Sequence, residues 1–304
     1  MPNWNEVLSE IQKNQIAGIT AVDIIRRKYL LELRGHTGRN IIAYYSGFLS
    51  KPEIQSDIND EDKNGFMMAV NNLDRTLGLD LILHTPGGGI AATQSLVDYL
   101  QRMFKSDIRA IVPQIAMSAG TILACCCKQI LMCKHSNLGP IDPHLNGMPT
   151  YGVIREFRRA LREVKRDPSR TALWQSIIGQ YHPTFLSQCE NAIKWSNEFV
   201  QLQLEQVMFK GKKTAQGDAA TVVRKLTDYS QNRTHDRHIH IDECRKMGLH
   251  VVEVESDQRL QDLLLTVHHC FMHSIMNTAT YKMIENHLGV AFVKQLSIGQ
   301  VPAR

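Results

Sequence analysis

Short apolar runs alternate with helix-like periodicity through the middle of the chain. The runs at residues 79–84, 108–113 and 129–133 are mostly apolar and bounded by turn-forming or charged residues, as buried strands are. Between the first two, residues 90–104 repeat apolar side chains at three- and four-residue steps, which predicts a helix with one core-facing stripe. Strands that alternate with helices over short connections predict an α/β fold with a mostly parallel sheet. Ligands of such sheets bind at the carboxyl ends of the strands.

The same patterns divide the chain into three parts. Residues 1–37 keep apolar side chains at helical spacing and predict an N-terminal helical arm. Residues 38–255 hold the alternation of strands and helices, starting with a strand at 40–45. Within this part, residues 183–210 predict a long amphipathic helix with more apolar surface than one small domain needs. Such surplus apolar surface is typical of a contact with a partner. Residues 256–304 predict a C-terminal helical extension.

Two glycine-bearing turns, at residues 84–89 and 116–121, lie at the predicted carboxyl edge of the sheet. A backbone N–H can approach a developing oxyanion only where no side chain blocks it, and consecutive glycines give that access. A serine that opens a helix gains from the positive end of the helix dipole, and the next N–H can face the same way as its hydroxyl. The pattern predicts a nucleophile and an oxyanion site formed by Ser118, Gly87, Gly88 and Ala119.

Each turn also has a simpler interpretation. A glycine-rich turn after a strand can bind phosphate or only connect two elements, and a serine before a helix is usually an N-cap. The Gly-Lys-Ser or Gly-Lys-Thr of a nucleotide-binding loop is absent, and residues 87–90 do not complete a dinucleotide fingerprint. The combination of the two turns is therefore more specific for acyl-transfer chemistry than either turn alone.

At these residues the chain resembles the Clp/crotonase-fold serine peptidases, and within them the signal peptide peptidase A group and its serine dehydrogenase proteinase relatives. The resemblance covers most of residues 38–255. It implies a Clp/crotonase-like fold, homo-oligomers, Ser118 as nucleophile, oxyanion donors from the Gly87–Gly88 turn and Ala119, and hydrolysis of peptide bonds in protein or peptide substrates. The motifs that carry it are Thr85-Pro86-Gly87-Gly88-Gly89, Ala116-Met117-Ser118-Ala119-Gly120-Thr121 and Leu138-Gly139-Pro140-Ile141-Asp142-Pro143.

The sequence leaves several candidates for the general base. Clp proteases place a histidine where this chain has Ile141 and Asp142, with His144 just beyond. The signal peptide peptidase A group uses a lysine farther along, whose pKa must fall from about 10.4 towards about 7 or 8. Lys165 lies much where that lysine lies and is the predicted base, although an ordinary solvated basic helix face is the competing interpretation. The alternatives are a histidine, Lys194, Lys212 or Lys213.

Histidines elsewhere carry weaker signals. His84 lies on the first turn and could contact substrate, or could simply be a satisfied turn residue. The closely spaced His235, His238 and His240, with Cys244 nearby, could bind zinc, but no recognised ligand spacing completes the set. We therefore expect neither a metal ion nor a cofactor.

Composition is typical of a globular enzyme. The 304 residues are 43% hydrophobic and 21% charged, which is enough to bury a full core. The net charge is +5, and the basic run at residues 155–170 is best explained as a solvated helix face, so no nucleic-acid partner is expected. No stretch reaches the roughly twenty apolar residues of a membrane span, and no signal peptide is visible at the start. Seven cysteines without a Cys-x-x-Cys pair favour buried thiols in the cytoplasm.

Two other classes of function stay open at this point. The crotonase branch shares the oxyanion geometry but acts on acyl-coenzyme A thioesters, typically with an acidic residue in place of the serine. A non-catalytic scaffold is the second class, and it applies if no lysine or histidine reaches Ser118.

Overall fold

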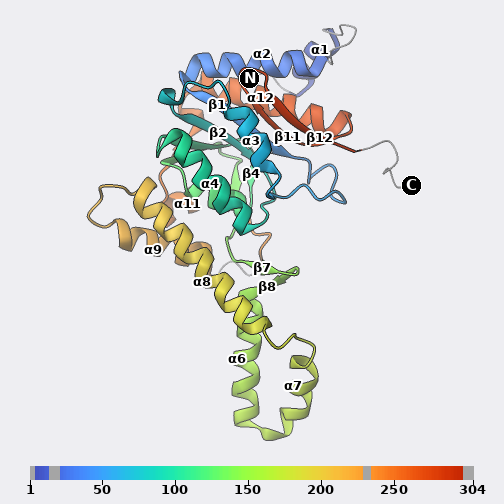
Figure 1. Ribbon diagram of the computed structural model, residues 1–304, viewed down its shortest axis with the longest axis vertical. Coiled ribbons are helices and arrows are strands. Elements are labelled where there is room, and N and C mark those ends of the chain that lie inside the picture. The colour runs from blue at the N-terminus through green and yellow to red at the C-terminus, as the bar shows by residue number, and fades with distance from the viewer. Residues whose placement is uncertain (1–3, 14–20, 229–233, 297–304) are drawn as a thin grey trace.

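A seven-stranded mixed sheet forms the centre of the computed structural model, which describes residues 4–13, 21–228 and 234–296 (Figure 1). The strand order is β10-β5-β3-β2-β1-β11-β12, and the first five strands are parallel while β11 and β12 are antiparallel. The α/β fold with a mostly parallel sheet is thereby confirmed. The strands are β1 (Asn40–Ser46), β2 (Leu79–His84), β3 (Ile108–Val112), β5 (Gln129–Met132), β10 (Val251–Glu253), β11 (Thr280–Asn286) and β12 (Ala291–Gln295).

Helices cover both faces of this sheet, because successive side chains of each strand point to opposite faces. On β1, Tyr44 packs into the cluster beneath α3 and α4, whereas Tyr45 packs into the cluster beneath α2 and α12. Figure 1 shows α2 and α12 on one side of the sheet and α3 and α4 on the other. These helices and the neighbouring α1 and α5 are α1 (Trp4–Lys13), α2 (Ala21–Thr37), α3 (Asp62–Val70), α4 (Ile90–Phe104), α5 (Ala119–Cys125) and α12 (Gln258–Asn277).

The C-terminal extension is only partly helical, so the prediction of a helical tail was wrong beyond Asn277. Residues 280–295 form β11 and β12 instead, and β11 pairs antiparallel with β1 so that Ile284 lies opposite Tyr44. Thr280, Tyr281 and Ile284 favour strand structure, and the open edge of β1 supplies the hydrogen-bonding partner. The extension is thus part of the central sheet.

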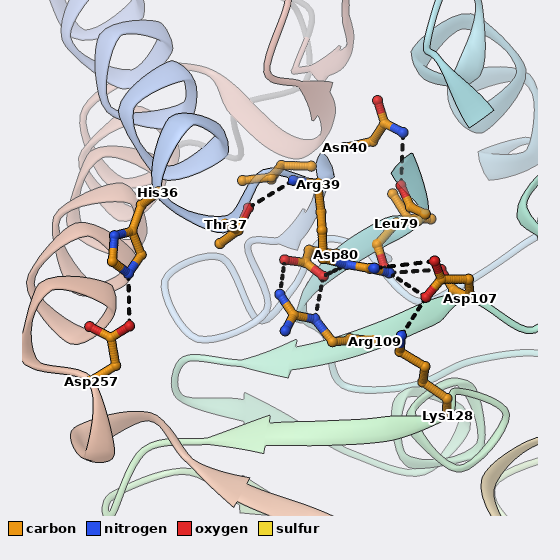
Figure 2. Close-up of polar contacts among 12 residues, drawn as sticks. His36, Thr37, Arg39, Asn40, Leu79, Asp80, Asp107, Arg109, Lys128 and Asp257 are labelled. Carbon is orange, nitrogen blue, oxygen red and sulfur yellow. Dashed lines mark hydrogen bonds and ion pairs between the residues drawn. The ribbon is translucent and has the colours of Figure 1, made fainter. Parts of the chain in front are cut away.

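Ion pairs join the amino ends of the parallel strands. Asp80 on β2 is fully buried, and Figure 2 shows the guanidinium groups of Arg39 and Arg109 both directed at its carboxylate. Arg39 Nε and Arg109 Nε each lie 2.7 Å from Asp80 Oδ1. Arg39 also pairs with Asp107, which accepts a further bond from Lys128 just before β5. Because the network lies at the amino edge, it leaves the carboxyl edge of the sheet to the two glycine turns.

A helical projection stands out from the body beyond the hairpin of β7 and β8, as Figure 1 shows. It consists of α6 (Thr150–Arg166), α7 (Thr171–Ile178) and the first part of α8 (Phe185–Gln203). A small apolar cluster joins α6 to α8, and α7 packs on α6. The long helix predicted over 183–210 is α8 followed by a π-helical turn at Leu204–Met208. Among the residues described, we find no helix with both the length and the apolar character that a membrane crossing requires.

The remaining elements are short or lie around the projection and the carboxyl edge. A small sheet has the order β4-β6-β9, in which β6 pairs with both neighbours. The elements are β4 (Ile115–Ala116), β6 (Asn137–Leu138), β7 (His144–Leu145), β8 (Met148–Pro149), β9 (Ile239–His240), α6 (Thr150–Arg166), α7 (Thr171–Ile178), α8 (Phe185–Gln203), α9 (Ala215–Leu226), α11 (Ile241–Met247), and the 3-10 turns η1 (Arg75–Leu77), η2 (Pro168–Arg170) and η4 (Val254–Ser256).

Candidate active site

The two predicted turns lie directly against each other. Thr85 N donates to Ile115 O at 3.2 Å, and Met117 N donates to Thr85 O at 3.0 Å, so a short parallel bridge joins Thr85 to Ala116. Gly120 fits this contact because a Cβ there would lie only 2.6 Å from the Thr85 Cγ2 atom. The structure therefore brings together the two motifs that the sequence separates by about thirty residues.

Ser118 occupies an unusual backbone conformation at the junction of β4 and α5. Its φ of 51° and ψ of −115° lie outside the regions that non-glycine residues normally adopt, and such strain gathers at functional sites. Ser118 is the N-cap of α5, yet its side chain makes no capping hydrogen bond. The N-cap interpretation therefore does not account for the hydroxyl, which is partly exposed and has no hydrogen-bond partner among the described residues.

Gly87 lies in contact with Ser118. A Cβ at Gly87 would meet Ser118 Cβ at 2.6 Å and Ala119 N at 2.9 Å, and the φ of 105° is itself one that L-residues rarely adopt. The Gly87 N–H is already engaged with Thr85 Oγ1 at 3.2 Å. Gly87 therefore provides space beside the serine, while its own N–H points to the threonine.

Two other N–H groups of the predicted oxyanion site have no acceptor among the described residues. Ile58 N donates to Gly87 O at 2.7 Å and Gly89 N donates to Ile58 O at 2.9 Å, so Gly88 N–H points away from Ile58. Ala119 is the first residue of α5, where an N–H lacks an intrahelical acceptor. Gly88 and Ala119 thus offer two unpaired donors on either side of the contact between Gly87 and Ser118.

His84 faces the core and not the site. Its side chain is fully buried against Tyr45, Phe48 and His268, with ring centroids 5.2–5.5 Å away, so it cannot contact a substrate in this structure. Neither ring nitrogen has a hydrogen-bond partner among the residues that the structure describes, and burial lowers the pKa of His84 to about 3. The ring is therefore neutral at physiological pH.

Asp142, His144 and His235 form a cluster that the sequence did not predict. Asp142 is 3% exposed; its Oδ1 lies 2.8 Å from His235 Nδ1 and its Oδ2 lies 3.3 Å from His144 Nε2. Burial alone would raise the pKa of Asp142, but the adjacent imidazoles of His144 and His235 outweigh it and hold that pKa well below its usual range. The two rings lie 4.1 Å apart between centroids.

The topology places this cluster at the edge that carries Ser118. Ala116 on β4 is paired with Leu138 on β6, and from that pair the chain runs two residues to Ser118 and four to Asp142. His235 precedes β9, which pairs with the other side of β6. His144 stands close to Asp142 in the sequence and offered a local signal. His235 is 93 residues away, and its sequence pattern grouped it with His238 and His240 instead of with Asp142.

The candidate lysines lie elsewhere. Lys165 is exposed in the last turn of α6, which runs away from the sheet along the projection in Figure 1. Lys194 is exposed on α8 near Glu198, and Lys212 lies over the Phe209 ring beside the exposed Lys213. A role of Lys165 as base stays a prediction.

The predicted histidine group does not assemble as a unit. His238 and His240 are exposed, and the buried Cys244 thiol donates to Ile239 O at 3.7 Å. Only His235 of that group turns inward, where it pairs with Asp142.

Comparison with known proteins agrees with this architecture. The family model described as ClpP-like SDH-type serine proteinase matches residues 24–274. The chain belongs to this family. The Clp/crotonase-like fold and the resemblance to serine dehydrogenase proteinases are thereby confirmed.

Two archaeal relatives match most of the chain. "Uncharacterized protein MJ1495" of Methanocaldococcus jannaschii is 26% identical over 233 residues, covering 74% of this chain and 71% of the relative. "Uncharacterized protein MJ0137" of the same organism is 26% identical over 235 residues, covering 76% of this chain and 74% of the relative. Neither name states a substrate, so the family and the site geometry carry the functional argument.

Proposed function

We propose that this protein is a serine endopeptidase that hydrolyses peptide bonds through Ser118. The observation that carries the proposal is the strained, uncapped Ser118, which packs on Gly87 between Gly88 and Ala119, two residues whose N–H groups have no acceptor among the described residues. Ser118 Oγ attacks the scissile carbonyl carbon while its proton passes to a base, and the two N–H groups stabilise the oxyanion. The amine product leaves with a proton from that base, and water then releases the acyl group from Ser118.

Two sources of the general base are consistent with this proposal. The resemblance to the signal peptide peptidase A group supports a Ser-Lys dyad with Lys165, supplied by a neighbouring copy in a homo-oligomer. The geometry of one chain supports a histidine of the Asp142 cluster, because a buried carboxylate can hold an imidazole in a fixed orientation. These sources differ in whether the site is complete within one chain.

Cleavage of an unfolded protein substrate tests the nucleophile. We expect wild type to cleave unfolded labelled casein, Ser118→Ala to lose the activity, and the exposed Ser187→Ala on α8 to retain it. A fluorophosphonate probe provides a second readout, since it should label wild type and Ser187→Ala but not Ser118→Ala. Cleavage by Ser118→Ala at the wild-type rate would contradict the proposal. If no variant cleaves casein or reacts with the probe, the result favours a non-catalytic scaffold. A thioesterase assay tests the crotonase alternative.

A mixing experiment separates the two base candidates. If the base is Lys165 of a neighbouring copy, Lys165→Ala and Ser118→Ala are each inactive, but reassembling the two together restores part of the activity. If the base lies in the Asp142 cluster, Lys165→Ala stays active and His144→Ala or His235→Ala loses activity. Light scattering on the same samples tests the predicted homo-oligomer, and fractionation of the producing cells tests the predicted cytoplasmic location.

A further inference from the structure

Two imidazoles and a carboxylate converge a few residues beyond the β4–β6 strand pair that also leads to Ser118, and these side chains are typical metal ligands. One ligand atom from each of Asp142, His144 and His235 lies within 4.8 Å of the other two. Histidine nitrogens with a carboxylate oxygen are typical ligands of zinc and other first-row transition ions, whereas calcium and magnesium prefer oxygen ligands. The sequence predicted no metal site, because two of the three ligands lie two residues apart and the third comes from a distant loop.

The two printed contacts of Asp142, one from each of its carboxylate oxygens, are close to the separations of ligand atoms around a tetrahedral ion. With bonds of about 2.0–2.1 Å at tetrahedral angles, neighbouring ligand atoms lie about 3.3 Å apart. His144 Nε2 lies 3.3 Å from Asp142 Oδ2, which matches this separation. His235 Nδ1 lies 2.8 Å from Asp142 Oδ1, so that pair would have to open by roughly half an ångström to admit the ion.

The described residues do not satisfy the full hydrogen-bonding capacity of the buried Asp142 carboxylate. Asp142 Oδ2 has no aligned hydrogen bond from any described residue, although the atom is buried. A buried polar atom without an aligned hydrogen-bond partner is costly, and a bound ion is one of the recognised explanations. The buried carboxylate of Asp142 also brings a negative charge to the cluster, which favours a cation at this position.

We propose that Asp142, His144 and His235 bind a divalent transition-metal ion of the zinc class. Three protein ligands leave a fourth position for water or another ligand. The ion would join the loop before β9 to the segment between β6 and β7, beside the strand pair that leads to Ser118. If a histidine of this cluster is the base of the proposed peptidase, the bound ion withholds its lone pair and keeps the enzyme latent; that consequence rests on the proposed function, but the binding does not.

Metal titration of the full, tag-free Ser118→Ala chain tests the binding without reference to activity. We expect calorimetry with Zn²⁺ to show one ion per chain, and Co²⁺ to give visible absorption bands of a nitrogen- and oxygen-ligated site. All seven cysteines are buried, so a thiolate signal would report another site. The double variant His144→Ala/His235→Ala should bind at least tenfold more weakly, whereas the control His238→Ala/His240→Ala, which changes two exposed histidines of the same region, should bind like its parent.

Folding is followed in the same samples, because the loss of two side chains could unfold the loop. Circular dichroism should be unchanged in both double variants, and Zn²⁺ should raise the melting temperature only where the ligands are intact. His235→Asn, which keeps a polar partner for Asp142, provides a milder variant and should also weaken binding. Absence of Zn²⁺ binding by Ser118→Ala, or equal binding by the His144→Ala/His235→Ala variant, overturns the proposal whatever the outcome of the peptidase assay.

Discussion

Replacing Gly87 by alanine tests the closest contact of the candidate site. The new methyl group would lie 2.6 Å from Ser118 Cβ, 2.8 Å from Met117 O and 2.9 Å from Ala119 N. Two of these three atoms belong to the backbone, which cannot swing away as a flexible side chain can. The substitution therefore pushes the serine and the start of α5 away from the glycine turn.

The expected size follows from two separate costs. Holding an L-residue at a φ of 105° costs roughly 1–2 kcal/mol, by analogy with the left-handed region. Forcing an extra carbon into a packed site costs typically about 1–3 kcal/mol. Gly87→Ala should thus lower the free energy of unfolding by about 2–5 kcal/mol. A displacement of Ser118 by about 1 Å should also reduce kcat/KM about a hundredfold.

Gly89→Ala is the matched control on the same turn. A Cβ at Gly89 meets its nearest atoms at 3.7 and 3.8 Å, and the φ of −66° suits any residue. Its cost should stay below about 1 kcal/mol, the scale of an unfavourable N-cap. Urea unfolding gives the stabilities, and the rate of fluorophosphonate labelling reports the reactivity of Ser118. If the free energies of unfolding of Gly87→Ala and Gly89→Ala differ by less than about 0.5 kcal/mol, the close packing of Gly87 on Ser118 is refuted.

Two further predictions concern buried titratable groups. Burial lowers the pKa of His84 to about 3. Below about pH 6.5 the unfolded chain therefore takes up a proton on this histidine that the folded protein does not. Stability falls as a result while the pH drops from about 6.5 towards about 3. Between pH 7 and pH 5 the free energy of unfolding should fall by about 2 kcal/mol more in the wild type than in His84→Phe. Equal losses of stability, measured by urea unfolding, would contradict the burial of the ring. Lys282 on β11 is fully buried, with Nζ 2.9 Å and 3.0 Å from the two carboxylate oxygens of Asp62. Lys282→Met leaves that carboxylate without its cation and should lower the free energy of unfolding in urea by about 3–5 kcal/mol. The double variant Lys282→Met/Asp62→Asn should partly recover this stability. A loss below about 1 kcal/mol in the single variant would show that the pair is not structurally important.

Local patterns predicted the elements that form the centre of the molecule. The helix over residues 90–104 has the predicted bounds, and β2 covers the predicted 79–84, because apolar periodicity and a glycine turn define both within a few residues. The proximity of the two turns also followed from sequence, since parallel strands bring their carboxyl ends to one edge. One predicted oxyanion donor differs in the structure: the Gly87 N–H donates to the Thr85 hydroxyl, a contact that only the folded turn reveals.

What the sequence could not predict depends on contacts between distant segments. His235 reaches Asp142 only because β9 pairs with β6, and two-residue strands give no recognisable pattern of their own. Likewise, helical periodicity predicts that Lys165 lies on a helix but not that α6 leads away from the sheet. The strand at 280–286 was mistaken for helix because β1 selects its conformation through pairing across 240 residues of chain.

The strain at Ser118 has a local structural explanation. A non-glycine residue in a sparsely populated backbone region costs about 1–3 kcal/mol and persists only where its surroundings leave no alternative. Here two hydrogen bonds join Thr85 to Ile115 and Met117, each contributing about 0.5–1.5 kcal/mol, and they fix the residues just before Ser118. The buried helix α5 fixes the residues just after it. The ion-pair network at the opposite edge joins β2 to β3, so neither turn can shift without disturbing the sheet. The same rigid frame positions the start of the segment to Asp142 through the pairing of β4 with β6. One edge of this fold therefore carries both the proposed nucleophile and the proposed metal-binding cluster.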